Sequence, residues 1–191
     1  KQAQTRIQVA GQDLPNFNPD LTDYYLEAKD GKADAVTASV SNNGLATVVP
    51  SVREGDPVRV IVKAENGDIL GEYRIHFTND KDLLARKPIA TVKQARLLQL
   101  GQNLELPSKV PVYFTGEKDY EVKDLAVEWE PVPAESLSKA GQVTVHGRLV
   151  GSDLPVELRV RVTDKLGESV SDNPYYDENS NQAFASETND A

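Results

Sequence analysis

Carboxylates are the most numerous side chains of this chain that could do chemistry. The 191 residues include 30 Asp and Glu, and two carboxylates that flank a glycosidic bond can hydrolyse it. Glu128 and Glu130 are close in sequence, but they alternate with Trp129. Alternation predicts that both point to the solvent face of a strand, so we expect no catalytic pair here.

Other catalytic residue types are few. His76 and His146 alternate with apolar residues, which predicts solvent-facing strand positions. No serine lies in a G-x-S-x-G motif, and no glycine motif for phosphates or dinucleotides occurs. Cysteine is absent, which excludes disulfides, thiolate metal sites and a cysteine nucleophile. We therefore predict that this chain is not an enzyme and has no cofactor.

Oxygen-rich clusters are candidates for calcium, a hard cation that takes oxygen ligands. Asp80 and Asp82 form one cluster, and Asp172, Asp177 and Glu178 form another. Neither has the spacing of an EF-hand, so solvated charge is the favoured interpretation and no metal site is predicted. An intramolecular isopeptide bond, which needs a buried triad, is left open.

Adjacent aromatic residues offer flat rings on which a sugar could stack. The pairs are Tyr24-Tyr25 and Tyr113-Phe114, and in a strand only one member of each pair faces the core. Tyr24, Tyr25 and Tyr113 are therefore the candidate glycan contacts. The alternative is that the outward ring covers a sheet edge or a neighbouring domain.

Charge and hydropathy argue against a nucleic acid partner and against a membrane span. The net charge is −9 and no Lys/Arg-rich run occurs, so a nucleic acid backbone would be repelled. No apolar run is long enough to span a membrane. The chain begins with Lys rather than Met, which indicates a processed or excised piece.

The elements that must position these residues are strands. Apolar and polar residues alternate in three runs, and Asn66-Gly67 predicts a hairpin turn between two others. Two short helices are predicted over 81–86 and 134–139. The alternating runs are 73–78, 125–130 and 156–163, and the hairpin strands are 58–64 and 70–77.

The strands group into two blocks. We predict a sandwich over residues 5–80, a linker over 81–88, and a second sandwich over 89–163. Residues 164–191 are rich in Asp, Asn, Ser and Glu, which is typical of a disordered tail or of the start of a following module. The predicted fold class is all-β: two tandem Ig-like antiparallel β-sandwiches with an extended acidic tail.

Four motifs follow one another in the second block: Leu106-Pro107-Ser108-Lys109-Val110, Val127-Glu128-Trp129, Gly141 to Gly147, and Gly151-Ser152-Asp153-Leu154. Together they give this block a resemblance to bacterial Ig-like domains. Trp129 would fill the centre of this sandwich, while Gly147 and Gly151 would relieve crowding. The first block, from Ile7 to Phe77, resembles cadherin-like modules, and 181–186 resembles the start of a discoidin-like carbohydrate-binding module.

This order of modules is similar to the C-terminal region of Gram-positive (streptococcal) cell-wall-anchored β-galactosidases. The resemblance implies non-catalytic modules of a secreted glycoside hydrolase that space and orient its catalytic and glycan-binding regions. It implies a monomer on the cell wall, with neighbouring domains as partners. The alternative is an adhesion module that binds host glycans or surface proteins directly.

Overall fold

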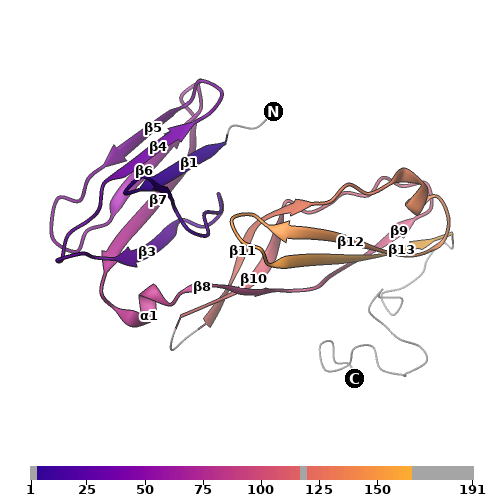
Figure 1. Ribbon diagram of the computed structural model, residues 1–191. Coiled ribbons are helices and arrows are strands. Elements are labelled where there is room, and N and C mark those ends of the chain that lie inside the picture. Colours follow the sequence, from indigo (N-terminus) through magenta and orange to yellow (C-terminus); the bar gives the residue numbers. More distant parts are fainter. Residues whose placement is uncertain (1–3, 117–119, 165–191) are drawn as a thin grey trace. The chain divides into compact units, whose positions relative to one another are not determined.

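The computed structural model describes residues 4–116 and 120–164 of the chain, and strands dominate it (Figure 1). The chain divides into two compact units. Unit 1 comprises Lys1–Ala90, Pro111–Ala126 and Val150–Ser152, and unit 2 comprises the rest. The predicted boundaries at 80, 88 and 163 remain a prediction.

Unit 1 contains two sheets, with the strand orders β2-β1-β4 and β3-β7-β6-β5 (Figure 1). The strands are β1 (Thr5–Val9), β2 (Gln12–Asp13), β3 (Asp23–Glu27), β4 (Val36–Val40), β5 (Leu45–Val49), β6 (Val58–Lys63) and β7 (Ile69–Thr78).

Alternation along β6 and β7 builds the core of unit 1. Val60 and Val62 are fully buried, as is Ile75, whereas the residues between them are more accessible. Each such side chain contributes about 1.5–3 kcal/mol by leaving water. The predicted hairpin is confirmed: β6 and β7 pair antiparallel, and Gly67 has a φ of 93° in the turn.

Unit 2 is built on β9 (Gln94–Gln99), β12 (Gly141–Leu149) and β13 (Pro155–Thr163). Leu98, Val145, Leu158, Val160 and Val162 form its buried cluster. Trp129, predicted at the centre, is instead half-buried and packs against this cluster, and its ring nitrogen donates to the Pro107 carbonyl at 2.8 Å.

The third sheet has the order β8-β10-β11-β12-β13-β9. Its other strands are β8 (Lys87–Thr91), β10 (Lys109–Thr115) and β11 (Tyr120–Trp129). Both short helices are found, as α1 (Lys81–Leu84), which Asp80 caps, and the 3-10 turn η1 (Ala134–Leu137). None of the helices in the described part is long and apolar enough to cross a membrane.

The predicted all-β sandwich class is thus confirmed. Most strand pairs are antiparallel, as predicted, but β3 pairs parallel with β7, and β9 pairs parallel with β13. Alternation determines which face a side chain occupies but says nothing of strand direction, so the sequence could not reveal this. The predictions on the tail concern residues outside the described range.

Candidate functional site

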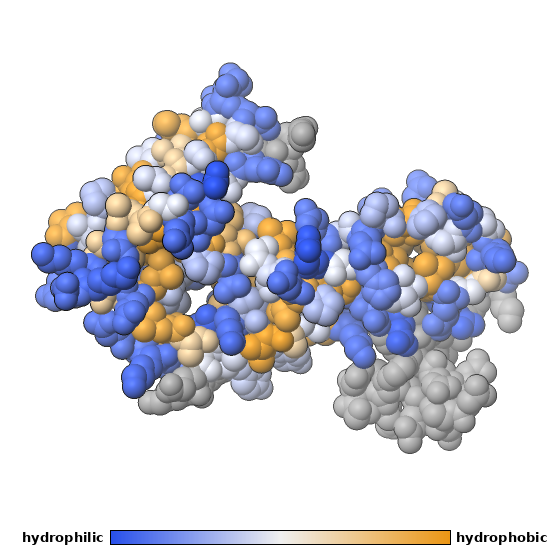
Figure 2. Space-filling view, viewed as in Figure 1, coloured by the Kyte–Doolittle hydropathy of each residue, from blue (hydrophilic) through white to orange (hydrophobic). Residues whose placement is uncertain are grey.

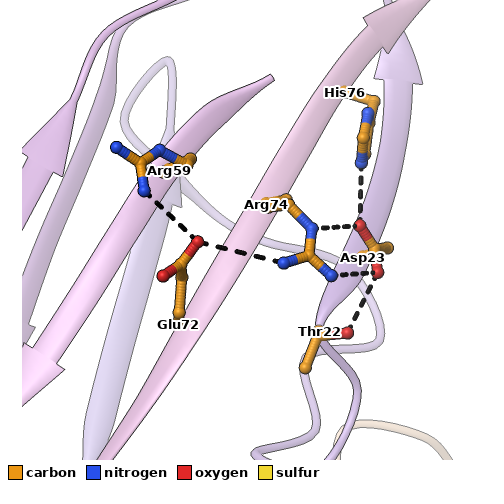
Figure 3. A network of polar contacts seen from close by, with 6 residues as sticks. All are labelled: Thr22, Asp23, Arg59, Glu72, Arg74 and His76. Atoms are coloured by element: carbon orange, nitrogen blue, oxygen red, sulfur yellow. Dashed lines mark hydrogen bonds and ion pairs between the residues drawn. The ribbon is translucent and has the colours of Figure 1, made fainter. Parts of the chain in front are cut away.

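A polar network on β3 and β7 surrounds Asp23 (Figure 3). The parallel register places Asp23 opposite Arg74. Arg74 donates from Nε to Oδ1 at 2.8 Å and from Nη2 to Oδ2 at 2.9 Å. Such a two-pronged contact is the strongest form of carboxylate–guanidinium pairing.

The remaining positions on the carboxylate are also occupied (Figure 3). Thr22 donates to Oδ2 at 3.0 Å, and Nε2 of His76 lies 2.9 Å from Oδ1. Burial raises the pKa of Asp23, but the hydrogen bonds from Arg74, His76 and Thr22 outweigh it and hold the pKa well below its usual range. Asp23 therefore stays ionised at neutral pH and is unsuited to act as a general acid.

Tyr25 lies beside this network on the outer face of the sheet. Its ring stacks on His76 with centroids 4.8 Å apart, and burial raises the pKa of its hydroxyl. Tyr25 also borders a cavity of about 520 Å³ in unit 1. The cavity is lined by Leu14, Pro15, Asn16, Leu21, Asp23, Tyr24, Tyr25, Leu26, Leu84, Ala85, Arg86, Lys87, Phe114, Thr115 and Gly116.

Asn18, a polar residue of unit 1, is buried and only 1% exposed. Its Nδ2 donates to the carbonyls of Ala126 and Val150 at 3.0 and 3.1 Å. Its Oδ1 accepts from the backbone N–H groups of Ala126 and Asp20, both at 3.0 Å. We call these contacts with Ala126 and Val150 the Asn18 junction.

Aromatic residues hold the loop that carries Asn18. The Phe17 ring lies between the rings of Tyr24 and Tyr73, with centroids 5.8 and 5.1 Å away. The hydroxyls donate to the carbonyls of Asn18 and Pro19, each at 2.9 Å. Burial raises the pKa of both tyrosines, so both hydroxyls stay protonated as donors.

Gly151 completes the Asn18 junction. Its φ of 82° favours glycine, and a Cβ at this position would lie 2.0 Å from the Phe17 carbonyl oxygen. The predicted relief of crowding at Gly151 is therefore confirmed, and so is that at Gly147, where a Cβ would lie 2.8 Å from the Trp129 ring.

The predicted glycan contacts occupy different environments. Tyr24 is 5% exposed and offers no surface to a sugar, because its side chain faces the core and its hydroxyl is engaged. Tyr25 is half-buried at the cavity. Tyr113 is 40% exposed and lies 6.4 Å, centroid to centroid, from Tyr120, which is 71% exposed.

The remaining predicted positions separate into two groups. Glu128, Glu130 and His146 are exposed, as alternation predicted. His76 is not fully solvent-facing, because it bonds Asp23 and its side chain is 27% exposed. Among residues 4–116 and 120–164, no group of three or more potential ligands could hold a metal ion. Asp172, Asp177 and Glu178 lie outside the described residues.

Sequence reasoning missed Asn18, Asp23 and Arg74 as parts of a site. Asp23 and Arg74 are 51 positions apart and Asn18 and Ala126 are 108 apart, so no local spacing could reveal them. The Asn18-Pro19 pair was a usable signal, because an asparagine that opens a turn often bonds the backbone two residues on, as Oδ1 does with the Asp20 N–H.

Comparison with known proteins connects part of the chain to a family. No curated protein is similar enough in sequence to match the chain. Residues 88–152 match the family model described as bacterial Ig-like domain (group 4). This match supports a bacterial Ig-like module over that part of the chain, as its four motifs predicted.

Proposed function

We propose that this chain is a non-catalytic surface module of a larger bacterial protein that spaces and orients the regions on either side of it. The Asn18 junction carries this proposal. A spacer can set orientation only if its segments do not rotate freely, and the junction fixes residue 18 to two backbone segments more than 100 positions away.

The chemistry of the junction favours a fixed geometry. Asn18 has two donors and an acceptor oxygen, and the contacts use all of them within a buried site. Separation would leave several backbone groups without partners, at about 1–3 kcal/mol for each buried one. On the face shown in Figure 2, hydrophilic side chains are interspersed with apolar ones, which suits a soluble spacer.

Spin labels can test this rigidity, because the chain has no cysteine. We would attach spin labels to Thr47→Cys and Asp124→Cys, at two exposed positions of unit 1. The distribution of distances between the two labels would be measured by double electron–electron resonance. One narrow distribution is expected, and it should broaden in Asn18→Ala but not in Asn79→Ala, an exposed control. A broad distribution in the wild-type chain would contradict the spacer function.

A finer form of the proposal concerns the parent protein. The module order that resembles Gram-positive β-galactosidases supports a secreted, cell-wall-anchored glycoside hydrolase as the parent. Its activity would reside outside this chain. Deleting residues 5–163 from that parent should leave hydrolysis of a small aryl galactoside unchanged and slow hydrolysis of wall-bound or polymeric glycan. Equal loss on both substrates would contradict a spacing role.

Tyr113 and Tyr120 favour a second candidate function, direct adhesion to glycans. Their neighbouring exposed rings offer apolar faces on which a pyranose could stack. A glycan array would test this function. Binding should disappear in Tyr113→Ala combined with Tyr120→Ala and persist in Tyr113→Phe, which keeps the ring. An array without any hit would remove this candidate.

A further inference from the structure

Strand β3 is an edge strand with unused backbone groups. It ends the order β3-β7-β6-β5 and pairs only with β7 within the described residues. In a parallel pair, residues alternate between those whose N–H and C=O face the partner and those whose groups face away. The Thr22 carbonyl and the Ala28 N–H both bond β7, so alternation directs the backbone groups of Asp23 and Tyr25 away from it.

These outward groups have no partner in the described part of the chain. No backbone hydrogen bond from a turn or loop reaches Asp23 or Tyr25, and β7 pairs with β3 along the other edge of the strand. Two N–H and two C=O groups therefore repeat at an interval of about 6.6 Å, the two-residue rise of a strand. This interval matches the backbone of another extended chain.

The cavity of about 520 Å³ lies along this edge. Four consecutive residues of β3, 23–26, line it, together with 84–87. Because successive side chains of a strand point to opposite faces, a cavity that touches four in a row borders the edge of the strand. Its volume is within the range of about 300–1,000 Å³ that is usual for ligand sites.

The residues that line the cavity determine which side chains a bound peptide could carry. Leu14, Leu21 and Phe114 are buried apolar residues of the lining. Arg86 pairs with Glu121, and the Asp23 charge is compensated by Arg74. Lys87 is exposed at the rim and takes part in none of the ion pairs of the described residues, so it leaves a local positive charge in an otherwise acidic chain.

We propose that the free edge of β3 binds a short extended peptide that carries an acidic side chain, by adding a strand beside Asp23 and Tyr25. Backbone hydrogen bonds supply the affinity, the apolar wall takes alternate side chains, and Lys87 selects the acidic residue. This peptide-binding site does not depend on the spacer function, and its lining does not include the Tyr113 and Tyr120 rings that favour glycans.

Nuclear magnetic resonance of the whole labelled chain tests the site. The probe is a blocked hexapeptide of alternating Thr and Val with one Glu. We expect shifts at the Asp23, Tyr25 and Lys87 amides, and exchange of the first two amides with solvent at least tenfold slower at saturation. Lys87→Glu should weaken binding at least fivefold, whereas Lys63→Glu, on β6, should change it less than twofold.

Control ligands separate the alternatives. The same peptide methylated on alternate backbone nitrogens should not bind, because strand addition needs those donors; equal binding would overturn the proposal. So would the absence of shifts at 1 mM peptide, or stronger binding of a peptide with Lys in place of Glu. Shifts at these amides with lactose alone would make it a saccharide site, and concentration-dependent shifts without ligand would make the edge a self-association surface. Either result would also overturn the proposal.

Discussion

Replacing Asn18 by alanine should weaken unit 1 at a single, identifiable place. The substitution removes the Asn18 side chain as a partner of the Ala126 N–H, the Asp20 N–H and the Val150 carbonyl. The Ala126 carbonyl keeps a bond from the Val150 N–H at 3.1 Å. The Ala126 N–H and the Val150 carbonyl are only half-buried, so each is expected to cost about 1–2 kcal/mol, the lower part of the range for an unsatisfied group, or about 2–4 kcal/mol together.

Native-state hydrogen exchange measures this cost locally. The Ala126 amide bonds the Asn18 side chain, so its exchange should accelerate about 30- to 700-fold if the opening free energy falls by that amount. Asn79→Ala, at an exposed position, should change the opening free energy of the Ala126 amide by less than about 0.5 kcal/mol. Acceleration below about threefold in Asn18→Ala would refute the reasoning.

Asn18→Asp adds a dependence on pH. The new carboxyl group would place an oxygen against the carbonyls of Ala126 and Val150, which now accept from Nδ2, so the folded state favours the protonated form. A folded pKa above the unfolded value of about 3.9 means that stability falls as pH rises from about 4. Equal stability of the variant at pH 4 and pH 7 would contradict this.

Three further substitutions test other contacts. Asp23→Asn should lower the free energy of unfolding by about 1–2 kcal/mol at pH 7. Because the pKa of Asp23 is lowered on folding, the wild type should lose this advantage as pH falls below about 4. Thermal melts from pH 6 to pH 2 would then show the stabilities of the wild type and the variant converging. Gly151→Ala should lower the melting temperature more than Gly67→Ala, because both have positive φ but only the former meets a carbonyl oxygen at 2.0 Å; equal effects would rule out the clash. Gly147→Ala should cost about 1–3 kcal/mol and red-shift tryptophan emission, because Trp129 is the only tryptophan and would be displaced; unchanged emission would contradict this.

The sequence alone predicted most of the local structure. Alternation over 58–64 and 70–77 gave the hairpin, because a period of two places every second side chain on one face. It also predicted that one ring of each aromatic pair faces the core, as Tyr24 and Phe114 do at 5% exposure each. Motif spacing predicted an Ig-like module over 89–163, and residues 88–152 match that family model.

Tertiary structure decided the rest. The parallel pairing of β3 with β7 joins Asp23 to Arg74 and leaves the β3 edge open. Neither feature follows from the alternation of apolar and polar residues, because alternation carries no information on strand direction. Asn18 finds Ala126 and Val150 only after the chain has folded. Hydrogen bonds depend on distance in space, whereas sequence patterns contain only distance along the chain. The local pattern therefore predicted the strands, and the tertiary fold determined which residues meet at each site.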